Sequence, residues 1–265
     1  LQAKFSSIKR AESRAQRFME NGNGMTSSLK SIREAVEKTG KTKQFYEYLY
    51  HLHNADRMTL EDRYSDVENK PVFGSSITAD ISNLEVAELE KRNPEFKRLA
   101  QEVYKYMGNL REMLVEGGVI SEETAQLWQE MYPHYVPIRR EGYDGVNINV
   151  PLDTGRTGIN APVKRAKGGT STILPLFDTM AQRTIQTFKA VAKNRFGVEL
   201  KNTLGTAIGS EAMSLDEAIE GVDTHEELLQ EGKNGRSPTF TVFENGEKVT
   251  FEITDEMYDA MKPKS

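Results

Sequence analysis

The pattern of hydrophobic and polar positions predicts that the first half of the chain is helical. Apolar residues recur at helical spacing up to residue 132, and residues that start or stop helices separate these stretches. Glycines interrupt the pattern after residues 21, 39 and 116, and Ser82 with Glu85 fits a capping box at a helix start. We expect helices over residues 3–20, 43–67, 82–92, 94–116 and 122–131, the last capped by Ser121. Ser27 or Ser28 can open one more helix, which closes at Gly40.

The helical pattern stops between residues 133 and 173. This stretch contains six glycines and four prolines, and only "VNINV" alternates like a strand. We call residues 133–173 the strap. A long irregular segment inside a folded domain is uncommon, and it is usually either functional or disordered.

Regular patterns return after the strap. We expect a helix from about residue 176 and a short capped helix from Ser214. A β-hairpin is expected over residues 239–253, where two alternating runs flank Asn245-Gly246, and Thr254 caps a last helix. The predicted fold is mainly α: a multi-helix domain with a long irregular central strap and a small C-terminal β-hairpin, an α-rich α+β class.

The predicted organisation has three parts. Residues 1–132 form a helical part, the strap covers 133–173, and residues 174–265 form a helical part with the β-hairpin. The chain starts without methionine, and we expect one composite domain cut from a larger protein. Its 265 residues are enough for a substantial core.

The composition excludes several classes of site. Cysteine is absent, so disulfides, thiolate nucleophiles and cysteine-ligated metals are excluded. No apolar stretch reaches the roughly 20 residues of a membrane span, and the N-terminus lacks the apolar core of a secretory signal. The net charge of −5 is unevenly distributed, because residues 133–203 carry eleven basic and five acidic side chains, whereas residues 204–265 carry five and fourteen.

The segment "HLHNADR", residues 51–57, is the first candidate for chemistry. On a helix, His51 and His53 point about 160° apart, so they cannot bind one metal ion together. Asp56 falls inside the apolar stripe, where a carboxylate needs a partner. We expect Arg139 or Arg140 as that partner and a structural anchor as its role; the alternative is an acid–base or ligand-binding role.

The segment "YPHYVPIRR", residues 132–140, is the second candidate. Its prolines favour an extended backbone. The segment combines three aromatic side chains, Tyr132, His134 and Tyr135, with two arginines, Arg139 and Arg140. Arginine and aromatic side chains suit a phosphate or a nucleobase. The interpretation we favour is a rigid connection that crosses the helices and pairs its arginines with their carboxylates, Asp56 among them.

Other motifs give two further hypotheses. Lys164, Arg165 and Lys167 of the strap, with Arg139 and Arg140, could bind nucleic acid, and binding to DNA would then depend strongly on salt. A hydrolase-type enzyme would use His53, Asp56 and His134, provided that these three side chains lie together in one pocket. The chain has no phosphate-binding GxxxxGK[ST] or GxGxxG motif and no GxSxG motif, and no cofactor or metal is predicted.

Four segments resemble one family in their order along the chain. They are "HLHNADR", the "GSSIT" turn before a helix, "GGVISEETAQLWQEMYPHYVPIRRE" and "ENGEKVTFEITDEMYDAM". Over about residues 45–262 the chain resembles the large polyvalent protein-associated domains. Such domains occur in very long multi-domain proteins of phages, prophages and conjugative elements, beside methylase, helicase, peptidase or toxin modules.

The resemblance implies a non-catalytic scaffold or interaction module of a phage or prophage polyvalent protein. It further implies packaging in the virion with delivery alongside ejected DNA, and a location in the virion or the bacterial cytoplasm. The implied partners are other modules of the parent protein or virion proteins. No catalytic residue comes with the resemblance, and in this interpretation His53, Asp56, Arg57, Tyr132, His134, Tyr135, Arg139 and Arg140 are structural or binding residues.

Overall fold

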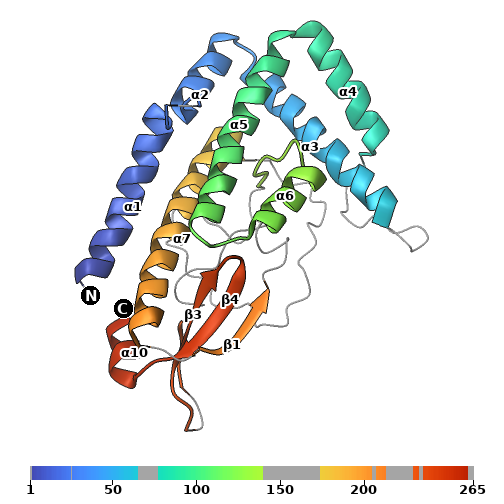
Figure 1. Cartoon of the computed structure of the whole chain (residues 1–265). Coiled ribbons are helices and arrows are strands. Elements are labelled where there is room, and N and C mark those ends of the chain that lie inside the picture. The colour runs from blue at the N-terminus through green and yellow to red at the C-terminus, as the bar shows by residue number, and fades with distance from the viewer. Residues whose placement is uncertain are drawn as a thin grey trace. The chain divides into compact units, whose positions relative to one another are not determined.

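The computed structural model describes residues 2–24, 26–64, 77–139, 174–204, 207–212, 229–232 and 235–261. Within these ranges the protein is mainly helical, with a four-stranded antiparallel sheet near the C-terminus (Figure 1). The expected α-rich α+β class is confirmed. None of the helices in these ranges is both long enough and apolar enough to cross a membrane. The helices are α1 (Gln2–Asn21), α2 (Leu29–Lys38), α3 (Thr42–Tyr64), α4 (Ala79–Arg92), α5 (Glu95–Glu116), α6 (Glu122–Met131), α7 (Leu176–Leu204) and α10 (Asp255–Met261).

Three helix starts coincide with capping residues that the sequence shows. Ser28, Ser121 and Thr254 each accept a hydrogen bond from the backbone N–H three residues later, at 3.0, 3.0 and 3.3 Å. Each side chain therefore satisfies a donor that has no partner within the helix. The expected helix from Ser214 and the "VNINV" strand lie outside the described residues.

The start of α4 differs from the prediction. Its N-cap is Thr78, whose side chain accepts a hydrogen bond from the N–H of Ile81 at 3.3 Å. Ser82, the expected cap of a Ser82–Glu85 capping box, lies inside the helix and is fully buried. The capping-box prediction is wrong because the Ser82 hydroxyl bonds to side chains of α3 and not to its own helix.

The chain divides into two compact units, each built from segments that are distant in sequence. Unit 1 comprises residues 1–17, 109–127 and 184–265, and unit 2 comprises residues 18–108 and 128–183. The three-part division into residues 1–132, 133–173 and 174–265 stays a prediction.

Aromatic side chains form the centre of unit 2. The rings of Phe45 and Tyr48 on α3 lie 5.2 and 5.7 Å from that of Phe96 on α5, and all three are buried. The hydroxyl of Tyr48 donates to Glu90 of α4 at 2.7 Å. These contacts, together with the packing of α4 on α3 (Figure 1), fix which face of α3 is turned towards the core.

The sheet of unit 1 is larger than the predicted hairpin. The hairpin itself is confirmed: β3 (Thr239–Glu244) pairs with β4 (Glu247–Glu252), and positive φ angles of 51° at Asn245 and 81° at Gly246 suit its tight turn. Two further strands, β1 (Ala207–Ala212) and β2 (Leu229–Gln230), give the order β1-β4-β3-β2. Figure 1 labels β1, β3 and β4 of this sheet. The sequence did not reveal them, because β1 contains few bulky apolar residues and β2 is only two residues long.

One face of the sheet packs closely against α7. A Cβ atom at Gly197 would lie 2.5 Å from Cγ1 of Val242 and 2.8 Å from Cε1 of Phe240, so only glycine allows α7 to pass β3 at this distance. The buried residues of this core are Leu229, Phe240, Val242, Val249, Phe251, Ile253 and Met261.

Asn194 of α7 holds the end of β3 in place. Its Nδ2 donates to the carbonyl oxygens of Phe243 at 2.8 Å and Gly117 at 2.9 Å, and its Oδ1 accepts from the Phe243 N–H at 2.7 Å. Asn194 is buried, so these hydrogen bonds are shielded from water. One amide therefore ties α7 both to the hairpin and to the loop after α5.

Replacing Asn194 with alanine should lower the free energy of unfolding by about 2–4 kcal/mol, because three buried backbone groups lose their partner. Urea unfolding measures this change. Asn202→Ala is the matched control, since Asn202 is exposed on the same helix and its loss should cost less than about 0.5 kcal/mol. Equal stability of the two variants would contradict a clamping role for Asn194.

Candidate functional site

The "HLHNADR" motif lies on α3 and spans a buried and a half-buried face. His53, Asn54 and Ala55 are buried, whereas His51 and Asp56 are half-buried. The difference in burial between His51 and His53 agrees with the expectation that they point to different sides of the helix.

The described part of the strap, residues 133–139, forms neither helix nor strand. After α6 ends, the chain turns sharply, and the N–H of Tyr135 donates to the carbonyl oxygen of Tyr132 at 3.2 Å. Residues 135–137 are buried. At the far end, the N–H of Leu174 donates to the carbonyl oxygen of Arg139 at 2.9 Å, which joins this segment to the chain just before α7.

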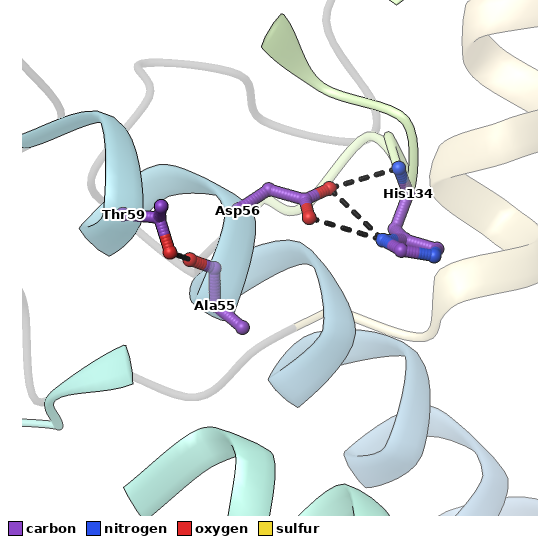
Figure 2. Close-up of polar contacts among 4 residues, drawn as sticks. All are labelled: Ala55, Asp56, Thr59 and His134. Carbon is purple, nitrogen blue, oxygen red and sulfur yellow. Dashed lines mark hydrogen bonds and ion pairs between the residues drawn. The ribbon is translucent and has the colours of Figure 1, made fainter. Parts of the chain in front are cut away.

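Asp56 connects α3 to the strap through His134 (Figure 2). Its Oδ2 accepts the backbone N–H of His134 at 2.9 Å, and the ring Nδ1 lies 3.0 Å from Oδ1 and 3.2 Å from Oδ2. An ionised carboxylate can only accept hydrogen bonds, so Nδ1 carries the proton. In the neutral ring Nε2 then keeps a lone pair, and Figure 2 shows the ring extending away from Asp56.

Within the described residues the partner of Asp56 is His134, and of the two expected arginines Arg139 is not its partner. Asp56 bonds to His134, and within residues 133–139 it forms no ion pair with Arg139. Arg140 lies outside the described residues. The turn after α6 brings the backbone and ring of His134 to the carboxylate, whereas Arg139 lies at the other end of this segment. The two candidate motifs do contact each other, but through His134 and not through an arginine.

Aromatic rings surround His53. Its ring centroid lies 6.1 Å from that of Tyr132 and 5.7 Å from that of Tyr135. Burial and, to a smaller extent, the charges of Arg57 and His134 lower the pKa of His53 to about 3, and a hydrogen bond with the His134 backbone opposes this shift. His53 is thus neutral near pH 7. Its Nδ1 is buried and has no hydrogen-bond partner within the described part of the chain.

Tyr104 of α5 covers the ring of His134 and was not among the sequence candidates. The two ring centroids lie 5.2 Å apart at an interplanar angle of 65°. Burial raises the pKa of Tyr104, and the neighbouring Tyr48 and Asp56 raise it further, so its hydroxyl stays protonated. A single tyrosine within a helix gives no sequence signal for such a position.

A second polar cluster joins α3 to α4. Nδ2 of Asn54 donates to the Ser82 hydroxyl at 2.9 Å and to the carbonyl oxygen of Ile77 at 3.1 Å, and Nδ1 of His51 lies 3.3 Å from the same hydroxyl. Burial lowers the pKa of His51, while the charges of Glu85 and Glu47 oppose that shift. The cluster is internal, and its groups serve helix packing.

Arg183 of α7 is a buried cation that lies outside the candidate motifs of the sequence. Its Cζ lies 5.7 Å from the ring centroid of Trp128, which is also buried. Burial lowers the pKa of Arg183; Tyr135 opposes this shift, and the charge of Arg139 adds to it.

Several nucleic-acid candidates lie outside the described residues, namely Arg140, Lys164, Arg165 and Lys167. Arg139, the remaining one, is half-buried. In the part of the chain with described side chains, no three histidine or carboxylate groups are placed to hold a metal ion. Comparisons with protein-family models, with curated proteins and with solved structures found no match.

Proposed function

We propose that this chain is a scaffold or interaction module of a large multi-domain protein carried by a phage, prophage or related mobile element. The observation that carries the proposal is the contact between Asp56 and His134, because it joins two of the segments on which the family resemblance depends. In this role the polar groups of both motifs are used to hold the strap against α3. The finer proposal is that the parent protein is packaged in the virion and delivered with DNA.

A surface on α4 supports binding to another protein. Leu84 is 68 % exposed and Ile81 is 46 % exposed, and residues three apart lie next to each other on a helix. The opposite side of α4 buries Ser82 and Leu89. Neighbouring apolar side chains that stay exposed are typical of protein contact surfaces, so we propose Ile81 and Leu84 as the binding surface for another module or a virion protein.

Site-specific photo-crosslinking tests this proposal in the full-length parent protein, expressed in cells that carry the mobile element. A benzoyl-phenylalanine at position 84 should crosslink to one defined partner, which mass spectrometry identifies as another module of the parent or a virion protein. The same group at Lys97, an exposed polar position on α5, is the matched control and should give no such product. Equal crosslinking at both positions would contradict the proposal.

DNA binding distinguishes the nucleic-acid hypothesis from this one. A module that binds only proteins should elute from immobilised duplex DNA at about 50 mM salt, because it gains little from the release of counterions. Retention that weakens steeply with added salt would instead favour binding of DNA by the basic segment.

A further inference from the structure

Asp56 and His134 form a pair with the geometry of an oriented base, and we propose that it gives the chain a chemical activity beyond the scaffold function. In this proposal His134 takes an acyl group from a carboxylic ester at Nε2 and passes it to water. Asp56 is the positioning residue, because it acts through the imidazole and does not contact the ester.

Asp56 restrains the His134 ring at two points. The same carboxylate binds the backbone N–H at 2.9 Å and Nδ1 at 3.0 Å, which limits rotation of the side chain. The bond to Nδ1 also selects the tautomer in which Nε2 is basic. A base held in its reactive state and orientation loses little entropy when a substrate arrives.

His134 also combines orientation with access to solvent. Its side chain is 38 % exposed, whereas that of Asp56 is 13 % exposed. Tyr104 packs against the ring, and within the described residues Nε2 takes part in no hydrogen bond. The other two histidines with described side chains lack these features, since His53 is buried and His51 faces the Ser82 hydroxyl.

The proposed reaction has two balanced steps. The Nε2 lone pair forms a bond to the ester carbonyl carbon, and the bond from that carbon to the leaving alkoxide or phenolate oxygen breaks. Water then adds to the acyl carbon, the bond to Nε2 breaks and the carboxylate leaves. Of the two protons of that water, one goes to the alkoxide or phenolate and the other is released to solvent. Asp56 stabilises the positive charge on the acylated ring, as an acidic partner does for an imidazolium.

Hydrolysis of 4-nitrophenyl acetate by the full chain tests the activity. His134→Asn should lower the rate above background about tenfold, less than the roughly 100-fold contributed by a positioned base in an enzyme. Asparagine can still donate to Asp56 from a position near that of Nδ1, so the fold should be retained. His51→Gln is the matched control and should keep the full rate. A His134→Asn protein as active as the wild type would overturn the proposal.

Ring ¹⁵N chemical shifts of the unmodified protein give a second test that needs no variant to fold. Wild-type His134 should show a protonated Nδ1 and an unprotonated Nε2, and His53 the reverse, because its bond to a backbone group of His134 leaves its Nδ1 without a partner. Asp56→Asn should reverse the tautomer of His134 and lower the ester rate, since an amide can donate to Nδ1. A protonated Nε2 in wild-type His134 would exclude the base. Crosslinking from position 84 is independent of these outcomes, so the scaffold proposal stands or fails separately.

Discussion

Acidification should destabilise this protein as the pH falls from about 6.5 towards 3, and His53 should account for about 4 kcal/mol of that loss. In the unfolded chain a histidine takes up a proton near pH 6.5. In the folded protein, burial lowers the pKa of His53 to about 3. The unfolded state therefore binds more protons throughout this window. The full contribution to stability is present above about pH 6.5 and is lost as the pH falls.

Urea unfolding of the wild type and of His53→Gln, measured at several pH values, tests this expectation. Glutamine does not titrate, and its amide can replace the hydrogen bond to the His134 backbone, so the variant should show a much shallower dependence on pH. His51→Gln is the control: the pKa of His51 is also lowered, but this side chain is only half-buried. The dependence of the unfolding free energy on pH should therefore be nearly the same in His51→Gln as in the wild type. If His53→Gln kept that slope as well, His53 would not be the cause.

Replacing Asp56 with alanine should lower the free energy of unfolding by about 2–4 kcal/mol, since both a backbone N–H and a ring N–H of His134 lose a charged acceptor. The loss of stability should first affect residues 133–139. Residues 133–139 are held to α3 at this point, so the amide of His134 should exchange with solvent much faster in the variant. Hydrogen exchange with mass spectrometry or NMR measures this effect directly.

A double-mutant cycle separates this contact from general damage to α3. Asp56→Ala and His134→Ala should be coupled by about 1–3 kcal/mol, because each removes the partner of the other. Asp56→Asn should cost less than Asp56→Ala, since its carbonyl oxygen still accepts the backbone N–H. Additive effects of the two alanine substitutions would show that the side-chain contact contributes nothing.

Both predictions concern one joint, in which α3 provides His53 and Asp56 and the strap provides His134 with its neighbouring tyrosines. A deeply buried neutral histidine beside the hydrogen bonds of Asp56 makes the joint sensitive to acid and to loss of a single carboxylate. The same arrangement leaves the His134 side chain 38 % exposed.

Much of the secondary structure and the class of fold could be predicted from local patterns. The helix starts at Ser28, Ser121 and Thr254 depend on a hydrogen bond to a residue three positions away, and the hairpin depends on the Asn245-Gly246 turn. Such signals are contained within a few neighbouring residues. The start of α4 could not be predicted, because a tertiary contact removed Ser82 from the capping role.

The sequence by itself determined which segments are helical, where the hairpin turns, and that a carboxylate at position 56 lies close to the buried face of its helix. Only the tertiary structure decided its partner: His134 is 78 positions away, and Arg139 is farther still along the chain. It also decided the burial of His53, the role of Asn194 and the addition of β1 and β2 to the sheet. The physical reason is that caps and periodicity depend on neighbours along the chain, whereas these contacts depend on the path of the folded chain.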